Sequence, residues 1–181
     1  MDLLQKVRQA LFLNELDGNP RALYRFSDAG GKSGLSFGLC QLDASNNEMA
    51  VACLRECGFT ETEIAQVKRK AAADLNAKLA AASAVIDKYD NAQVEECLHH
   101  VIDVATVRGF EFADDEAIVH AADYHNQFFM SRDGKMAMHL AGLDKPVTGE
   151  DIRDFKLQLA WGKKRPDDVK RRYDNVVKTC R

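Results

Sequence analysis

The chain has little proline, no paired cysteine motif and no long apolar run. Of its 181 residues three are proline, and no apolar stretch approaches the roughly 18 residues that a membrane-spanning helix needs. Five cysteines without a CxxC pair argue against a disulfide framework and for thiols that stay reduced. A net charge of −3 excludes a global basic field for nucleic acid or anionic membranes. What remains, with 46% apolar and 29% charged residues, is typical of a globular protein.

The chain does have helical patterning on both sides of one glycine-rich segment. Apolar residues at helical spacing, Leu3, Val7 and Leu11 among them, predict a first helix over residues 2–16. Residues 19–45 lack that period and are expected to form a loop with one or two short strands in a small hairpin. Further helices are expected near residues 49–57, 60–73, 74–89, 93–107, 114–129, 134–142, 149–161 and 166–179. Thr60 and Glu63 have the spacing of a capping box, and Pro166 is expected at the start of the last helix. The fold class is therefore mainly α, in a single domain over residues 1–181.

Carboxylates on both sides of the glycine-rich segment are the candidates for chemistry. Glu15 lies near the end of the first predicted helix, and Asp28 and Asp43 follow in the loop region. Carboxylates that a loop holds near each other are what bond hydrolysis by acid and base groups requires. Asp17 is a rival for the acid, but residues two apart on a helix point to different faces. Glu15 follows the apolar stripe at the right spacing and is the predicted acid.

The phrase Phe37-Gly38-Leu39-Cys40-Gln41-Leu42-Asp43 is the most specific motif. Its apolar and polar residues alternate as in an extended segment, and Gly38 is expected to let the backbone approach a ligand or a neighbouring strand closely. Behind Glu15 and Asn19-Pro20, it resembles the segment of lysozyme-like lytic transglycosylases in which a GLMQ phrase follows a catalytic glutamate. It is still more similar to goose-type lysozymes, whose segment reads FGLMQVD. The resemblance covers residues 12–47. Cys40 replaces the usual Met, and Leu-Asp-Gly follows Glu15 where the transglycosylases carry Ser. Tyr124-His125-Asn126 resembles, in stretched form, a Tyr-Asn phrase that lines their cleft.

The resemblance implies a lysozyme-like helical domain that cleaves the β-1,4 glycosidic bonds of bacterial peptidoglycan. Glu15 would protonate the leaving oxygen, and Asp43 or Asp28 would position the attacking water in an inverting hydrolase. Asp43, directly after the Gln41 phrase, favours hydrolysis. The alternatives on the same scaffold are a lytic transglycosylase, which needs no second carboxylate, and a chitosan or chitin hydrolase. The residues implied in substrate binding are Ser36, Gly38, Gln41, Tyr124 and Asn126.

No cofactor and no metal are expected. The histidines form no H-E-x-x-H or H-x-x-E-H phrase, and His120 and His125 stand five residues apart, off one helix face. Cys53 and Cys57 sit one helical turn apart without further ligands at matching spacing, which favours buried thiols. Gly30-Gly31-Lys32-Ser33 ends like a phosphate-binding loop but lacks its first glycine at the required spacing.

The N-terminal segment is amphipathic, without a basic leader or a small-residue cleavage site. We therefore expect a protein that is cytoplasmic as synthesised and reaches the cell wall after release or delivery. A phage endolysin released through holin pores fits this expectation. So does an effector delivered by a secretion machine, with an immunity protein as partner.

A competing class is non-enzymatic. In a helical binding or regulatory domain the glycine-rich region would be an interaction loop, and Glu15 an exposed helix-end residue. Replacing Glu15 by glutamine separates the two classes, because only an enzyme would lose turnover.

Overall fold

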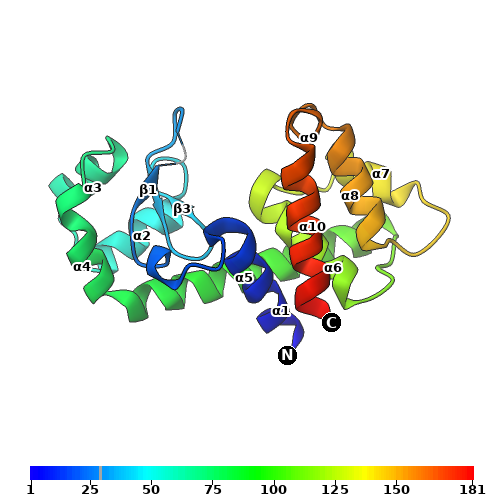
Figure 1. Cartoon of the computed structure of the whole chain (residues 1–181), viewed down its shortest axis with the longest axis horizontal. Helices are drawn as coiled ribbons and strands as arrows, with labels where there is room; N and C mark the ends of the chain where they lie inside the picture. Colours follow the sequence, from blue (N-terminus) through cyan, green and yellow to red (C-terminus); the bar gives the residue numbers. More distant parts are fainter. Residues whose placement is uncertain (29) are drawn as a thin grey trace. The chain divides into compact units, whose positions relative to one another are not determined.

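The computed structural model describes residues 1–28 and 30–181, and over these residues the chain is mainly helical with one small antiparallel sheet. The sequence predicts a single domain, whereas backbone contacts divide the chain into two compact units (Figure 1). We call residues 15–93 the sheet unit, and residues 1–14 with 94–181 the helical unit. Two helices, α1 (Leu3–Leu16) and α5 (Ser83–Arg108), contribute residues to both.

The sheet unit contains three short strands where the sequence predicted a loop with a hairpin. They are β1 (Ser27–Asp28), β2 (Leu35–Phe37) and β3 (Leu42–Asp43), antiparallel in that order. Ser36 of β2 stands opposite Ser27 on one side and Asp43 on the other. The middle strand is buried throughout, and Phe26 contacts the rings of Phe37 and Phe59 edge-on. Aromatic and leucine side chains thus give this small sheet a core of its own.

The helices of the sheet unit are α2 (Glu48–Glu56), α3 (Glu61–Lys68), α4 (Asn76–Ala81) and the first part of α5. The capping box predicted from the sequence is confirmed. The Thr60 hydroxyl accepts from the Glu63 backbone N–H, and the Glu63 carboxylate accepts from the Thr60 N–H at 2.7 Å. The predicted break between helices over 74–89 and 93–107 is wrong. Residues 83–108 contain neither glycine nor proline, so nothing in the backbone interrupts α5.

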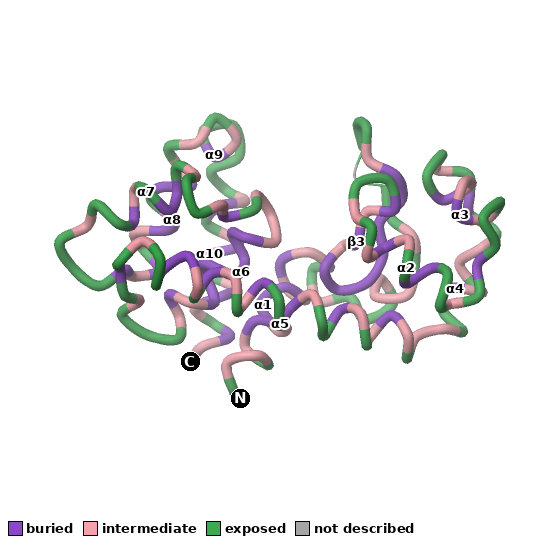
Figure 2. The backbone as a smooth tube through the Cα atoms, turned by 180° about the vertical axis from the view of Figure 1, so that it is seen from behind, coloured by how far each residue is buried: buried purple, intermediate pink, exposed green. Residues whose placement is uncertain are grey.

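The helical unit contains α6 (Asp115–Phe128), α7 (Lys135–Ala141), α8 (Gly149–Gln158), α9 (Ala160–Lys164) and α10 (Pro166–Cys180). Helix α8 contacts each of the other four, and buried residues recur along α6 and α10 (Figure 2). Pro166 opens α10 as predicted, because a proline at the first helical position loses no backbone hydrogen bond. The helix predicted over 149–161 is divided at Leu159, whose backbone is extended.

Candidate active site

Glu15 stands on the last turn of α1, where the sequence predicted it. Its side chain is partly buried between the buried residues Asn14 and Leu16, whereas Asp17 is exposed and already outside the helix with a φ of 50°. Asn19 then accepts a hydrogen bond from the Arg21 N–H and begins a short 3-10 turn. Of the two acids at this helix end, Glu15 is therefore the less exposed one.

Asp28 is exposed on β1, the outer strand of the sheet. Its Oδ1 accepts from the Gly30 N–H at 2.7 Å and pairs with Lys70 Nζ at 2.6 Å. The hydrogen bond from Lys70 holds the pKa of the Asp28 carboxyl below its usual range. Both of these hydrogen bonds go to Oδ1 of the exposed carboxylate. An ionised, exposed carboxylate of this kind can accept a proton from water.

The FGLCQLD phrase forms the turn of a hairpin, not the continuous extended segment expected from its alternation. Gly38 to Gln41 connect β2 to β3, and Gly38 and Gln41 have φ values of +76° and +53°. The turn is held by Asp90 of α5, whose carboxylate is fully buried. Asp90 accepts from the Leu39 N–H at 2.7 Å and from the Cys40 N–H at 3.1 Å.

Gly38 is required at this turn for two reasons. Its φ is one that residues with a side chain rarely adopt, and a Cβ there would lie 2.8 Å from Asp90 Oδ1. The sequence predicts that Gly38 lets the backbone approach a ligand or a neighbouring strand closely. The partner that approaches in the structure is the Asp90 carboxylate, so Gly38 serves the turn.

Gln41 and Ser36 also hold the hairpin together. The Gln41 side chain accepts from the Ser27 hydroxyl at 2.5 Å and donates to the Gly38 carbonyl at 3.0 Å. Ser36 is buried, and its carbonyl accepts from the same Ser27 hydroxyl at 3.3 Å. The Gln41 side chain and the Ser36 carbonyl are thus engaged within the hairpin, and the substrate-binding role of both residues stays a prediction.

Asp43 is engaged by its own loop on both carboxylate oxygens. Oδ1 accepts from the Gly34 and Ser45 N–H groups at 3.0 and 2.8 Å, and Oδ2 accepts from the Asn46 amide at 2.7 Å. Burial raises the pKa of Asp43, but these hydrogen bonds outweigh it and hold the pKa below the usual range. A carboxylate with its lone pairs occupied is poorly placed to activate water, so the contacts favour Asp28 over Asp43 for that role.

Tyr124 and Asn126 lie on α6 in the helical unit, while the other candidate residues belong to the sheet unit. Tyr124 is only 7% exposed and packs against Phe128 and Phe155, and burial raises the pKa of its phenol. Its side chain belongs to the hydrophobic core, and its role in substrate binding stays a prediction. Asn126 is partly buried, and its predicted role stays a prediction.

A buried charged network in the helical unit was not predicted. Asp123 pairs with Arg172 at 2.6 Å and with Lys156 at 3.3 Å, and all three are at most 5% exposed. Burial alone would raise the pKa of Asp123, but Arg172 and Lys156 hold it well below its usual range. The fourth member is Asn14, whose amide donates to Asp123 at 2.9 Å. Asn14 is the residue directly before Glu15, so this network reaches the end of the helix that carries the candidate acid.

Over residues 1–28 and 30–181 no group of three or more His, Cys, Asp or Glu side chains is arranged to hold a metal ion. Within the same residues no helix combines the length and the apolar character that crossing a bilayer demands. Neither a protein-family model nor a curated protein nor a solved structure matches the chain. The assignment of the site therefore depends on its own residues.

Proposed function

We propose that the protein is a glycoside hydrolase that cleaves β-1,4 bonds of bacterial peptidoglycan, with a chitosan or chitin chain as the alternative substrate. Glu15 is the general acid that protonates the leaving glycosidic oxygen. Asp28 is the general base that takes a proton from the attacking water on the opposite face of the sugar. An inverting reaction of this type needs its carboxyl groups roughly 6.5–9.5 Å apart, so that a water molecule fits between substrate and base.

The observation that carries the proposal is the composition of the sheet unit. A partly buried glutamate at a helix end and an exposed, ionised aspartate on β1 belong to one compact unit. The FGLCQLD turn in the same unit is held by the buried Asp90, so its backbone has one defined conformation. A partly buried proton donor and a solvated carboxylate are the pair that glycoside hydrolysis uses.

A second candidate, a lytic transglycosylase, is favoured by the contacts of the two aspartates. Asp43 is occupied by its loop, and Asp28 is bound by Lys70. A transglycosylase uses a hydroxyl of the substrate as nucleophile, so neither aspartate would be needed for catalysis and both would have a structural role. Glu15 keeps the same role as acid in either reaction.

The test is release of glycan fragments from purified peptidoglycan and from chitosan, analysed by mass spectrometry. The wild type is compared with Glu15→Gln, which keeps the size of the side chain and removes its proton-donating carboxyl. Asp17→Asn is the matched control, because it changes the neighbouring exposed carboxylate at the same helix end. We expect activity in the wild type and in Asp17→Asn, and none in Glu15→Gln.

The products then separate the candidates. Reducing ends together with a loss of at least roughly a hundredfold in Asp28→Asn support the hydrolase, since general base catalysis contributes about 10²–10⁴-fold. Anhydro-muramyl products with an active Asp28→Asn support the transglycosylase. If the wild type releases no sugar from either polymer, or Glu15→Gln is as active as the wild type, the proposal is wrong and a binding domain becomes the better account.

A further inference from the structure

Two cysteines at the end of α2, both in the sheet unit, lie in direct contact. Cys53 and Cys57 are free thiols one helical turn apart, and their Sγ atoms are 4.0 Å apart. Cys53 is fully buried, whereas Cys57 is partly exposed, so the pair is accessible from solvent on the Cys57 side. Cysteine thiolates are the ligands that soft metal cations prefer.

The backbone around Cys57 maintains this contact. The Cys57 N–H donates to the Cys53 carbonyl at 2.8 Å, so the helical spacing persists as far as Cys57. Gly58 then has a φ of +82°, and the Phe59 N–H donates back to the Leu54 carbonyl at 3.0 Å. This is the Schellman arrangement of a helix end. Hydrogen bonds on both sides of Cys57 therefore hold its backbone one turn from Cys53.

The distance between the two sulfurs suits a shared metal ion. With metal–thiolate bonds of about 2.3 Å, two sulfurs on one cation are roughly 3.8 Å apart at a tetrahedral angle and about 4.6 Å apart in a linear arrangement. The observed 4.0 Å lies between these limits. A disulfide, by contrast, requires the sulfurs to approach to about 2.05 Å. The pair is thus already spaced for a cation and not for a disulfide.

The two sulfurs also share a proton that a cation can replace. The hydrogen bond from Cys53 lowers the pKa of the Cys57 thiol, and the same bond together with burial raises the pKa of Cys53. The Lys88 ammonium interacts favourably with a Cys53 thiolate. The carboxylates of Asp90 and Glu56 oppose it. A cation between the sulfurs would offset this repulsion as well as that between the two thiolates.

Two thiolates fit Cu(I) better than the other cations that bind sulfur. Structural zinc takes four protein ligands, and iron–sulfur clusters are held by four cysteines. Cu(I) is a soft cation with a filled d shell, and two thiolates alone form stable complexes with it. We propose that Cys53 and Cys57 form a binding site for one Cu(I) ion.

Binding at this site changes protonation and not oxidation state. The two thiols release their protons to water, two S–Cu bonds form and copper stays Cu(I), so the occupied site carries one negative charge. A two-ligand site is distinct from a metal-holding group of three or more His, Cys, Asp or Glu side chains, which residues 1–28 and 30–181 do not contain. The inference does not depend on the glycan chemistry proposed above.

The experiment is an anaerobic titration of the reduced protein with Cu(I) held by the coloured chelator bicinchoninate. Loss of the chelator's colour follows the transfer of copper, and native mass spectrometry counts the bound ions. The variants are Cys53→Ala and Cys57→Ser, the second of which changes a partly exposed residue at the helix end. The matched control is Cys180→Ser, because Cys180 is the other partly exposed cysteine and lies on α10. Circular dichroism checks that each variant is folded.

We expect the wild type and Cys180→Ser to take up one Cu(I) ion with equal affinity. Cys53→Ala and Cys57→Ser should each weaken binding by more than the roughly 10–100-fold that loss of an outer-shell partner costs, because each removes a ligand itself. X-ray absorption of the copper-loaded wild type should show two sulfur neighbours. Binding should weaken as the pH falls, because protons compete with copper for the thiolates.

Several results would overturn the inference. One is a wild type that takes no copper from the chelator. Another is a folded Cys57→Ser that binds copper as tightly as the wild type, and a third is an equal loss of binding in Cys180→Ser. A disulfide between Cys53 and Cys57 in place of bound copper would also contradict it. None of these results bears on glycan cleavage, so the two proposals stand or fall separately.

Discussion

Replacing Asp90 by asparagine should destabilise the sheet unit more than a carboxylate-to-amide change elsewhere on α5. Asp90 is fully buried, and its two oxygens accept from the Leu39 and Cys40 N–H groups at 2.7 and 3.1 Å. An asparagine has one oxygen and one amide nitrogen at these places. One backbone N–H keeps its acceptor, and the other faces an N–H₂ group that cannot accept.

The expected loss follows from these two bonds. A hydrogen bond to a charged group contributes about 1.5–3 kcal/mol, and a buried donor left without an acceptor costs about 1–3 kcal/mol more. Removing a buried charge offsets part of this, since burying a carboxylate is itself unfavourable. We therefore expect Asp90→Asn to lower the free energy of unfolding by about 2–4 kcal/mol.

The assay is urea unfolding followed by circular dichroism, with Asp87→Asn as control. Asp87 lies one turn earlier on α5 and accepts from the half-buried Tyr24 hydroxyl at 3.0 Å, a bond that an asparagine oxygen can also accept. The control should lose less than about 1 kcal/mol. If Asp90→Asn is no less stable than Asp87→Asn, the anchoring role given to Asp90 is refuted.

Two further predictions concern stability. Gly38→Ala should cost about 2–4 kcal/mol in urea unfolding, because it combines a strained φ with a Cβ 2.8 Å from the anchored Asp90 carboxylate. Gly58→Ala, with a φ of +82° and no atom within 4 Å of the added Cβ, should lose only the strain. Burial lowers the pKa of both His120 and His125 to about 4, so the unfolded chain takes up their protons first as the pH falls. Stability should therefore decline from about pH 6.5 to pH 4, and His120→Leu should show about half of that decline when unfolding is measured across this range.

Local signals in the sequence predicted the helices well. The apolar spacing before Glu15, the Thr60 capping box and the start of α10 at Pro166 all depend on residues within a few positions of each other, and the structure confirms them. The break expected near residue 90 is wrong, because α5 runs without interruption from Ser83 to Arg108. Without glycine or proline, the backbone there has no reason to leave the helix.

The roles of the candidate site residues depend on partners far along the chain, which the sequence alone does not identify. Asp90 holds the Leu39–Cys40 backbone across some fifty positions, and Asp28 is paired with Lys70. The signal that could have found Asp123 is its place in a run of buried residues on α6, where a lone carboxylate requires a cationic partner. Nothing nearby in the sequence indicates that the partners are Lys156 and Arg172.

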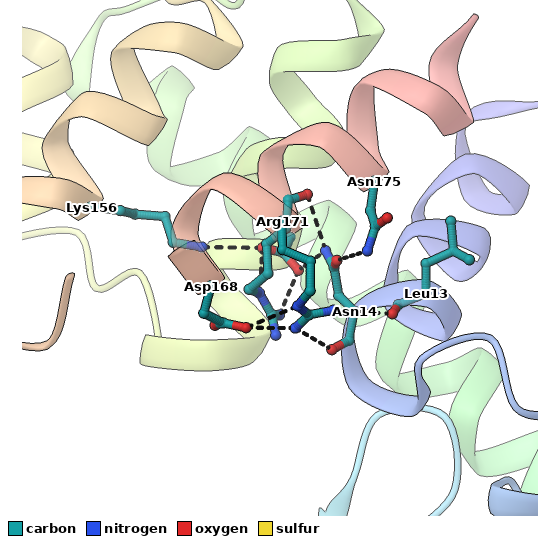
Figure 3. A network of polar contacts seen from close by, with 8 residues as sticks. Leu13, Asn14, Lys156, Asp168, Arg171 and Asn175 are labelled. Carbon is teal, nitrogen blue, oxygen red and sulfur yellow. Dashed lines mark hydrogen bonds and ion pairs between the residues drawn. The ribbon is translucent and has the colours of Figure 1, made fainter. Parts of the chain in front are cut away.

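The charged network of the helical unit is better explained by geometry than by stability. A buried ion pair contributes little net stability compared with well-packed apolar residues of the same volume, because desolvation offsets the attraction. The ion pairs of this network are of the buried type, whose desolvation cost is high, since Asp123, Lys156 and Arg172 are all at most 5% exposed. Hydrogen bonds are directional, and those with Asp123 and Asn175 hold the Asn14 side chain in one orientation (Figure 3). Apolar side chains of similar volume at these three positions would give a core of equal or greater stability. Apolar side chains would not fix the orientation of Asn14 in this way, because they form no directional bonds with its amide.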